Sequence, residues 1–228
     1  MRKMIQSGLL AASVIGLSFG SIASADEEME TDTGMGNNEC PVGLVSGKTL
    51  DEEFGSGSQE LTRCLERRSQ VKVVVQINQL CRDTACSSPY ALGNISNMIK
   101  DYEITHGMQQ GRDYEIVAVV HSGGWGMLVK DGYEFTNVEG EGGGAPGPKT
   151  LENDFESTVV GLMNQGVRFL FCQNTTRGMI GRGNLPTVAE STYGGGATEA
   201  LIDGVEYTTA GITALVDFQR QGYKYVQP

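Results

Sequence analysis

Residues 71–77 read Val-Lys-Val-Val-Val-Gln-Ile, a short run dominated by β-branched residues. Such a run is typical of a strand buried on both faces of a parallel sheet. Similar runs recur downstream, separated by segments with apolar residues at helical spacing. The predicted strands are 71–77, 114–120, 167–171, 205–209 and 223–226, and the predicted helices are 90–102, 151–165 and 212–221. This alternation predicts an α/β fold of three α/β/α layers, flavodoxin-like, with a mainly parallel sheet of about five strands.

Two segments interrupt this pattern and are expected to be insertions. One lies near residues 139–150 and contains the glycine-rich run 139–148, and the other spans 178–203 and includes three consecutive glycines. Neither run is followed by the Gly-Lys-Ser/Thr of a phosphate-binding loop, and neither joins a strand directly to a helix in the dinucleotide arrangement. Nucleotide binding is therefore disfavoured.

Upstream of residue 71 the composition changes. Residues 26–57 are acidic and rich in Gly, Ser, Thr and Asn, which predicts an extended or poorly ordered arm. Residues 59–68 carry Leu61 and Leu65 at helical spacing, which indicates a short amphipathic helix. The chain is thus expected to hold an arm at 26–70 and an α/β domain at 71–228.

The first 25 residues have the features of an export signal. Arg2 and Lys3 precede a short apolar region, and Ala23-Ser24-Ala25 is a typical cleavage site before an acidic segment. The apolar region is broken by glycine and serine and is short for a membrane span, so a retained anchor is the less favoured alternative. We expect a periplasmic or secreted protein that is not held in a membrane after the signal is removed.

The charge balance limits the possible partners. The chain has 17 Lys and Arg against 28 Asp and Glu, a net charge of −11. Such a chain repels nucleic acid and anionic lipid, so neither is expected as a partner. An anionic ligand would need locally placed positive charge, for which Arg177 and Arg182 are candidates.

Five cysteines in an exported chain leave at least one outside intramolecular disulfides. Cys40 and Cys64 could staple the arm. Cys81 and Cys86, in the loop after the first strand, could form a local disulfide or act as a redox pair that resolves a persulfide or disulfide on another cysteine. The remaining one, Cys172, follows the third strand and precedes the polar stretch 173–178, which is expected to be a loop.

The carboxyl ends of the first three predicted strands carry polar or nucleophilic residues, namely Asn78, His121 and Cys172. Neighbouring parallel strands would bring these ends to one crevice, where open α/β sheets bind ligands. A nearby histidine, arginine or loop N–H group would make the cysteine reactive by stabilising its thiolate. The competing interpretation is that Cys172 is a small buried hydrophobe and His121 a hydrogen-bonded strand end.

A set of short motifs in this order resembles the DsrE/DsrF-like family of sulfur-relay proteins over residues 71–228. The motifs are KVVVQIN (72–78), VVHSG (119–123), GVRF (166–169), CQNT (172–175), the segment 211–215 and QGYKYV (221–226). The resemblance implies a three-layer domain that assembles as a trimer or hexamer. It also implies that Cys172 carries sulfane sulfur as a persulfide, which it receives from or delivers to a thiol-bearing partner protein. On the same resemblance, His121 lies at the end of its strand.

On this hypothesis Asn78, His121 and Cys172 form the reactive centre, Gln173, Asn174 and Arg177 bind the ligand, and no cofactor is expected. A sulfurtransferase activity is left open. One alternative is a non-catalytic assembly or ligand-binding module on the same fold. A less favoured one is a copper-binding protein that uses Cys172, His121, His106 and methionines, because the chain lacks the usual metal-ligand spacings.

Overall fold

Five parallel strands form the sheet at the centre of the molecule. The computed structural model describes residues 47–56, 58, 70–81, 89–137, 145–186 and 195–228. The strands are β1 (Val71–Gln79), β2 (Tyr114–Gly123), β5 (Arg168–Cys172), β6 (Glu206–Thr208) and β7 (Lys224–Val226). They lie in the order β6-β5-β2-β1-β7, and all neighbouring pairs are parallel. The predicted α/β class and five-stranded parallel sheet are therefore confirmed.

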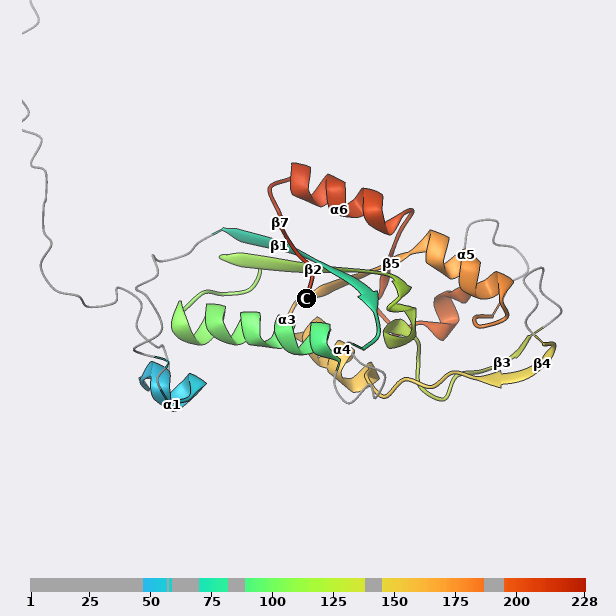
Figure 1. The fold of residues 1–228 in the computed structure, drawn as a ribbon, viewed down its shortest axis with the longest axis horizontal. Coiled ribbons are helices and arrows are strands. Elements are labelled where there is room, and N and C mark those ends of the chain that lie inside the picture. The colour runs from blue at the N-terminus through green and yellow to red at the C-terminus, as the bar shows by residue number, and fades with distance from the viewer. Residues whose placement is uncertain (1–46, 57, 59–69, 82–88, 138–144, 187–194) are drawn as a thin grey trace, which may run out of the picture. The chain divides into compact units, whose positions relative to one another are not determined.

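The two faces of this sheet are covered by different helices (Figure 1). Helix α6 (Gly211–Arg220) lies on one face, and helices α3 (Tyr90–Lys100) and α4 (Glu156–Asn164) lie on the other. Successive side chains of a strand point to opposite faces, so each central strand feeds two cores. The core under α6 contains Val74, Val117, Val119, Leu170, Ala214, Leu215 and Tyr223. The larger core on the opposite face includes Val73, Val75, Ile116, Ala118, Phe169 and Phe171 together with Leu92, Ile95, Val159 and Leu162.

The predicted helices begin or end at slightly different residues in the structure. Helix α3 continues into a π-helical turn over Asp101–Thr105, which buries Tyr102. Helix α4 begins at Glu156 rather than at residue 151. The positive φ values of Gly166 and Gly222, +87° and +90°, place both glycines in the left-handed region just after α4 and α6, as expected for glycine at helix ends.

The two expected insertions contain regular structure. The first includes an antiparallel hairpin of β3 (Glu134–Asn137) and β4 (Gly147–Thr150). The second contains a 3-10 helix, Gly195–Ala200, and supplies buried residues to the larger core, among them Leu185, Ala197, Ala200 and Leu201. The second segment is therefore part of the folded core rather than an addition to it.

The prediction of a polar loop at 173–178 is wrong, because helix α5 (Gln173–Gly181) begins directly after β5. Its sequence is poor in strong helix formers, so local propensity gave little sign of it. Tertiary packing supplies the missing stability, since Thr176 and Met179 are buried against the domain. The Thr176 hydroxyl also donates a hydrogen bond to the carbonyl oxygen of Cys172 at 3.2 Å.

The described part of the arm holds a short helix that the sequence did not predict. Helix α1 (Leu50–Phe54) starts in a capping box in which Thr49 and Glu52 satisfy each other's backbone N–H groups. Glu53 of α1 pairs with Lys100 of α3 at 3.1 Å. The predicted export signal, the predicted helix at 59–68, and Cys40, Cys64 and Cys86 lie outside the described residues. Within the described ranges, no helix has the length and apolar character needed to cross a membrane.

Candidate functional site

Three polar side chains extend the apolar rows that face α6. Gln76 follows Val74 by two residues on β1, His121 follows Val119 on β2, and Cys172 follows Leu170 on β5. The period-two alternation of strands puts each of them on the face covered by α6. All three are at least nine-tenths buried, with Cys172 5% exposed. The carboxyl ends of adjacent strands thus bring a thiol, an imidazole and an amide to one region under the start of α6.

Cys172 sits where two helices begin. It is the last residue of β5 and the N-cap of α5, and it is the free cysteine of the described residues. Its Sγ accepts a hydrogen bond from the backbone N–H of Gly211, the first residue of α6, at 3.2 Å. The N-cap of α6, Ala210, gives that helix no side-chain cap. The sulfur therefore accepts one of the N–H groups that a helix start leaves unpaired, at the end of the helix that stabilises negative charge.

Gly211 of α6 packs closely against His121. A Cβ atom on Gly211 would lie 3.1 Å from the Cβ of His121 and 3.2 Å from its Cγ and Cδ2. These contacts are tighter than ordinary van der Waals packing. Because Gly211 has no side chain, its N–H can reach the sulfur while the imidazole of His121 packs against the same residue.

Both ring nitrogens of His121 are engaged by groups other than Cys172. The amide nitrogen of Gln76 donates to Nε2 at 2.7 Å, and Nδ1 lies 2.9 Å from the hydroxyl oxygen of Ser122. The amide oxygen of Gln76 accepts a hydrogen bond from the hydroxyl of Tyr225 on β7. With Gln76 in this orientation Nε2 is an acceptor, so the imidazole is neutral and donates through Nδ1 to Ser122. Burial lowers the pKa of His121, which favours the same neutral form.

A bulge in β2 orients this region. Ile77 of β1 pairs with Val120 of β2, but Gln79 pairs with Gly123, so β2 accommodates one extra residue at His121–Ser122. Ser122 takes a left-handed φ of +51° at the bulge. Its backbone N–H donates to the Thr175 hydroxyl on α5 at 2.9 Å. The bulge therefore ties the end of β2 to α5, as bulges beside functional sites often re-aim side chains.

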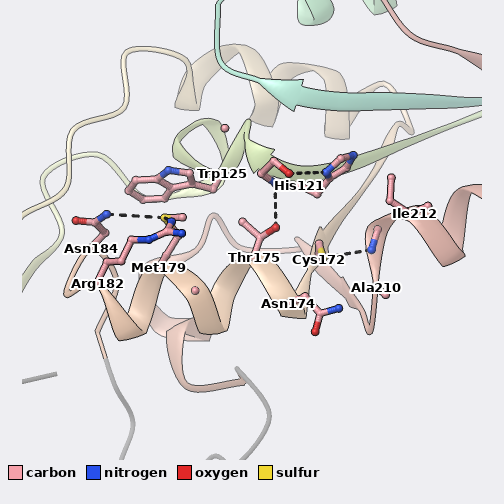
Figure 2. A pocket seen from close by; sticks show the side chains of 14 residues that line it. His121, Trp125, Cys172, Asn174, Thr175, Met179, Arg182, Asn184, Ala210 and Ile212 are labelled. Carbon is pink, nitrogen blue, oxygen red and sulfur yellow. Dashed lines mark hydrogen bonds between the residues drawn. The ribbon is translucent and has the colours of Figure 1, made fainter. Parts of the chain in front are cut away.

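A cavity of about 720 Å³ opens beside Cys172. Its two ends differ in chemistry (Figure 2). One end is formed by Cys172, Ala210 and Ile212, and the other by Trp125, Met179, Arg182 and Asn184. Thr175 and Gly178 of α5 line the cavity between them. Its volume is in the range of sites for small organic molecules.

The far end of the cavity is fixed by the way α5 ends. Arg182 is the C-cap, and Gly183 follows with a φ of +69°. The N–H of Gly183 bonds to the carbonyl of Ile180 at 2.8 Å, and that of Asn184 to the carbonyl of Met179 at 2.9 Å. This bonding pattern is a Schellman motif, which sets the direction in which the chain leaves the helix. Arg182 and Asn184 are thereby held at the rim beside Met179.

Asn78, expected beside Cys172, lines a different and much smaller cavity of about 10 Å³ together with Cys81. The residue of β1 that contacts His121 is Gln76, two positions earlier. Gln76 also lines this small cavity, but its side chain reaches the imidazole of His121, whereas Asn78 lies opposite the bulge in β2. The signal for Gln76 was a polar residue between the apolar residues Val75 and Ile77 near the end of the strand.

The ligand-binding residues predicted on α5 are only partly brought together. Asn174 lines the cavity, whereas Arg177 is exposed and donates a hydrogen bond to the Asn174 side chain. Among the described residues that line the cavity, Gln173 and Arg177 do not occur, and the arginine present is Arg182. Helical geometry explains why Arg182 rather than Arg177 lines the cavity, because a helix puts residues 175, 178 and 182 on one face.

Cys81 is disulfide-bonded. It lines the small cavity with Asn78 rather than the cavity beside Cys172. His106, the other histidine, has its Nε2 3.6 Å from an oxygen of Asp101 at the end of the α3 segment. Within the described residues, no group of three or more His, Cys, Asp or Glu side chains is placed to hold a metal ion.

Comparisons with known proteins give no family for this chain. No family model matches it, and no curated protein matches it. A solved structure of a protein of unknown function from Methanobacterium thermoautotrophicum is similar to it, at 22% sequence identity and a TM-score of 0.46. The alignment covers 70% of this chain and 100% of that one. The geometry around Cys172 is therefore the basis on which a function can be proposed.

Proposed function

We propose that this protein is an exported sulfur carrier that holds sulfane sulfur as a persulfide on Cys172. The observation that carries the proposal is the hydrogen bond from the Gly211 N–H to Sγ at 3.2 Å, made at the wall of a cavity large enough for a donor. A backbone donor at a helix start stabilises negative charge on sulfur without needing a charged side chain. A thiolate is the nucleophilic form of cysteine.

The transfer step conserves atoms and electrons. The Cys172 thiolate attacks the outer sulfur of a donor persulfide, R–S–SH, with its own electron pair. The S–S bond of the donor breaks, R–S⁻ leaves with that bond's electron pair, and Cys172 becomes Cys–S–SH. Delivery is the reverse reaction with an acceptor thiolate, so no external oxidant or reductant is required.

His121 has a positioning role in this scheme rather than that of a base. Its nitrogens are engaged by Gln76 and Ser122, and its ring packs under Gly211. Holding Gly211 in place holds the N–H that faces the sulfur. Asn78 has no part in the revised proposal, since it lines the separate small cavity.

The setting of the reaction is part of the proposal. The export signal implies an oxidising compartment, in which the disulfide at Cys81 persists while Cys172 stays free. We expect a thiol-bearing donor or acceptor and a homo-oligomer, trimeric or hexameric. Light scattering of the purified protein checks the assembly, and a monomer would contradict it.

Intact-mass analysis tests the proposal. The native protein is incubated with inorganic polysulfide, desalted and measured before and after reduction. We expect an adduct of one sulfur atom per chain that is released by reductant, and we expect none on Cys172→Ser. An adduct that survives Cys172→Ser, or no adduct on the wild type, would refute the carrier.

The cavity itself supports a second candidate, a ligand-binding module in which Cys172 is inert. Alkylation of the folded protein by iodoacetamide separates the two functions. Rapid modification of Cys172 is expected for the carrier. Modification only after unfolding would favour the module, because a buried structural cysteine reacts only when it is exposed.

A further inference from the structure

The cavity carries a positive side chain at the end opposite the thiol. Arg182 lines it, and the hydrogen bond that the structure gives its guanidinium goes to Met179 Sδ at 3.9 Å. A thioether is a weak acceptor, and none of the described carboxylates pairs with Arg182. In a chain of net charge −11, this guanidinium is a local site for an anion.

Arg182 and Cys172 lie too far apart for one small inorganic ion to touch both. They flank the nine residues of α5, and at 1.5 Å of rise per residue their Cα atoms are about 15 Å apart. Thiosulfate or a short polysulfide spans only a fraction of that length. A thiol of peptide size can place its sulfur at Cys172 while its far end reaches the guanidinium.

Gly178 keeps the middle of the cavity open. It lines the cavity, and a Cβ built on it would have no atom within 4 Å. Thr175, Gly178 and Arg182 follow one another at the spacing of a single helical face. Trp125, which is not part of α5, lines the same cavity. The cavity therefore has an aromatic side chain in its wall as well as the open space beside Gly178.

We propose that the sulfur donor is a small organic persulfide with a carboxylate at its far end, and the acceptor the corresponding thiol, which binds Arg182 while its sulfur lies at Cys172. This inference rests on the proposed function of Cys172. Arginine binds carboxylates in a bidentate manner, which would fix the orientation of the donor. The step is the transfer given above, with R a carboxylate-bearing group.

The test compares three donors by the rate at which they load Cys172, followed by intact mass. They are glutathione persulfide, the neutral persulfide of 2-mercaptoethanol, and inorganic polysulfide. For Arg182→Gln we expect the rate with glutathione persulfide, divided by that with either other donor, to fall roughly tenfold or more, the loss typical of one charge-assisted hydrogen bond. Gly178→Leu, which fills the channel, should lower the glutathione-to-polysulfide ratio similarly.

Gly181→Leu is the matched control for the second variant. Gly181 is in the same helix, its added Cβ would meet no atom within 4 Å, and it does not line the cavity. It should leave all three rates unchanged. Equal donor ratios in wild type, Arg182→Gln and Gly178→Leu would overturn the anionic subsite, while polysulfide loading of Cys172 would leave the carrier intact.

A binding measurement keeps the two proposals separable. Calorimetry with S-methylglutathione, which cannot transfer sulfur, is carried out on Cys172→Ser and on Cys172→Ser/Arg182→Gln. Binding that is weakened roughly tenfold or more by the second substitution supports the subsite even if no donor loads Cys172. Absence of binding, or equal binding to both variants, would overturn it.

Discussion

The two ends of helix α5 perform different tasks with different parts of the chain. At its start, the Sγ of Cys172 accepts a hydrogen bond from the backbone N–H of Gly211, and the residues that line the cavity include His121, Ala210 and Ile212. At its end, Arg182 is held by a Schellman turn among Trp125, Met179 and Asn184. The proposed reactive end depends on main-chain geometry, and the proposed recognition end depends on side chains. A glycine substitution at the first end should therefore act mainly on the reactivity of Cys172. One at the second end should act mainly on the packing of the turn that follows α5.

The largest effect is expected from Gly211→Ala at the thiol end. An added Cβ would lie 3.1 Å from the Cβ of His121, so the two residues must separate by a few tenths of an ångström, and we expect the Gly211 N–H to move away from the sulfur. A hydrogen bond to a charged group contributes about 1.5–3 kcal/mol, so alkylation of Cys172 in the folded protein should slow by about 10–100-fold. The measurement is the rate of iodoacetamide modification near neutral pH.

Gly93→Ala is the control for the effect of a glycine-to-alanine substitution in a helix and for differences in the preparation of the variants. Gly93 lies within α3, and a Cβ there would meet nothing within 4 Å. Its alkylation rate should equal that of the wild type. If Gly211→Ala also reacts at the wild-type rate, the backbone N–H does not determine the reactivity of Cys172.

Gly183→Ala probes the other end of α5 through stability. Gly183 and Gly132 share a φ of +69°, but only at Gly183 would an added Cβ collide, with the Asn137 side chain. Both substitutions carry the left-handed cost of about 1–2 kcal/mol. Overpacking should add about 1–3 kcal/mol at Gly183 alone. Urea unfolding measures both variants, and equal losses would mean that the turn after α5 can move without cost.

The smallest effect is expected from the pH dependence contributed by His121. Burial lowers its pKa below the ordinary value of 6.5, so the unfolded chain binds the extra proton first as the pH falls. The free energy of unfolding should therefore be complete above about pH 6.5 and decline below it, down to the folded pKa. His121→Gln should flatten this decline, measured by urea unfolding at several pH values. Parallel slopes for the two proteins would contradict a buried neutral imidazole.

The parallel sheet could be predicted because short runs rich in β-branched residues, such as 71–77 and 114–120, alternate with segments at helical spacing. The meeting of His121 and Cys172 in one cavity was also accessible, since strand ends of a parallel sheet share an edge. The donor to the sulfur was not, because Gly211 is distant in sequence and acts through its main chain. Neither the composition of the chain nor the spacing of its residues predicts that the N–H of Gly211 lies close to the sulfur of Cys172.

Of the two arginines named from the sequence, the prediction assigned ligand binding to Arg177, whereas Arg182 lines the cavity, because helix α5 was not predicted. Read as a loop, residues 173–178 favoured Arg177, the cation nearest to the cysteine. Read as a helix, the same segment puts Arg182 on the face of Thr175 and Gly178. The error with Asn78 has a similar origin, since the bulge at His121–Ser122 depends on a register between strands that one strand's sequence does not specify.

The central claim, that Cys172 carries transferable sulfur, is tested most directly by a two-step transfer. The protein is loaded with polysulfide, freed of excess reagent, and mixed with an acceptor thiol while the masses of both are followed. The account predicts that the peptide containing Cys172 first gains one sulfur atom and then loses it, while the acceptor gains a persulfide. Failure of Cys172 to gain the sulfur, or its retention on the protein in the presence of excess acceptor, would contradict the account.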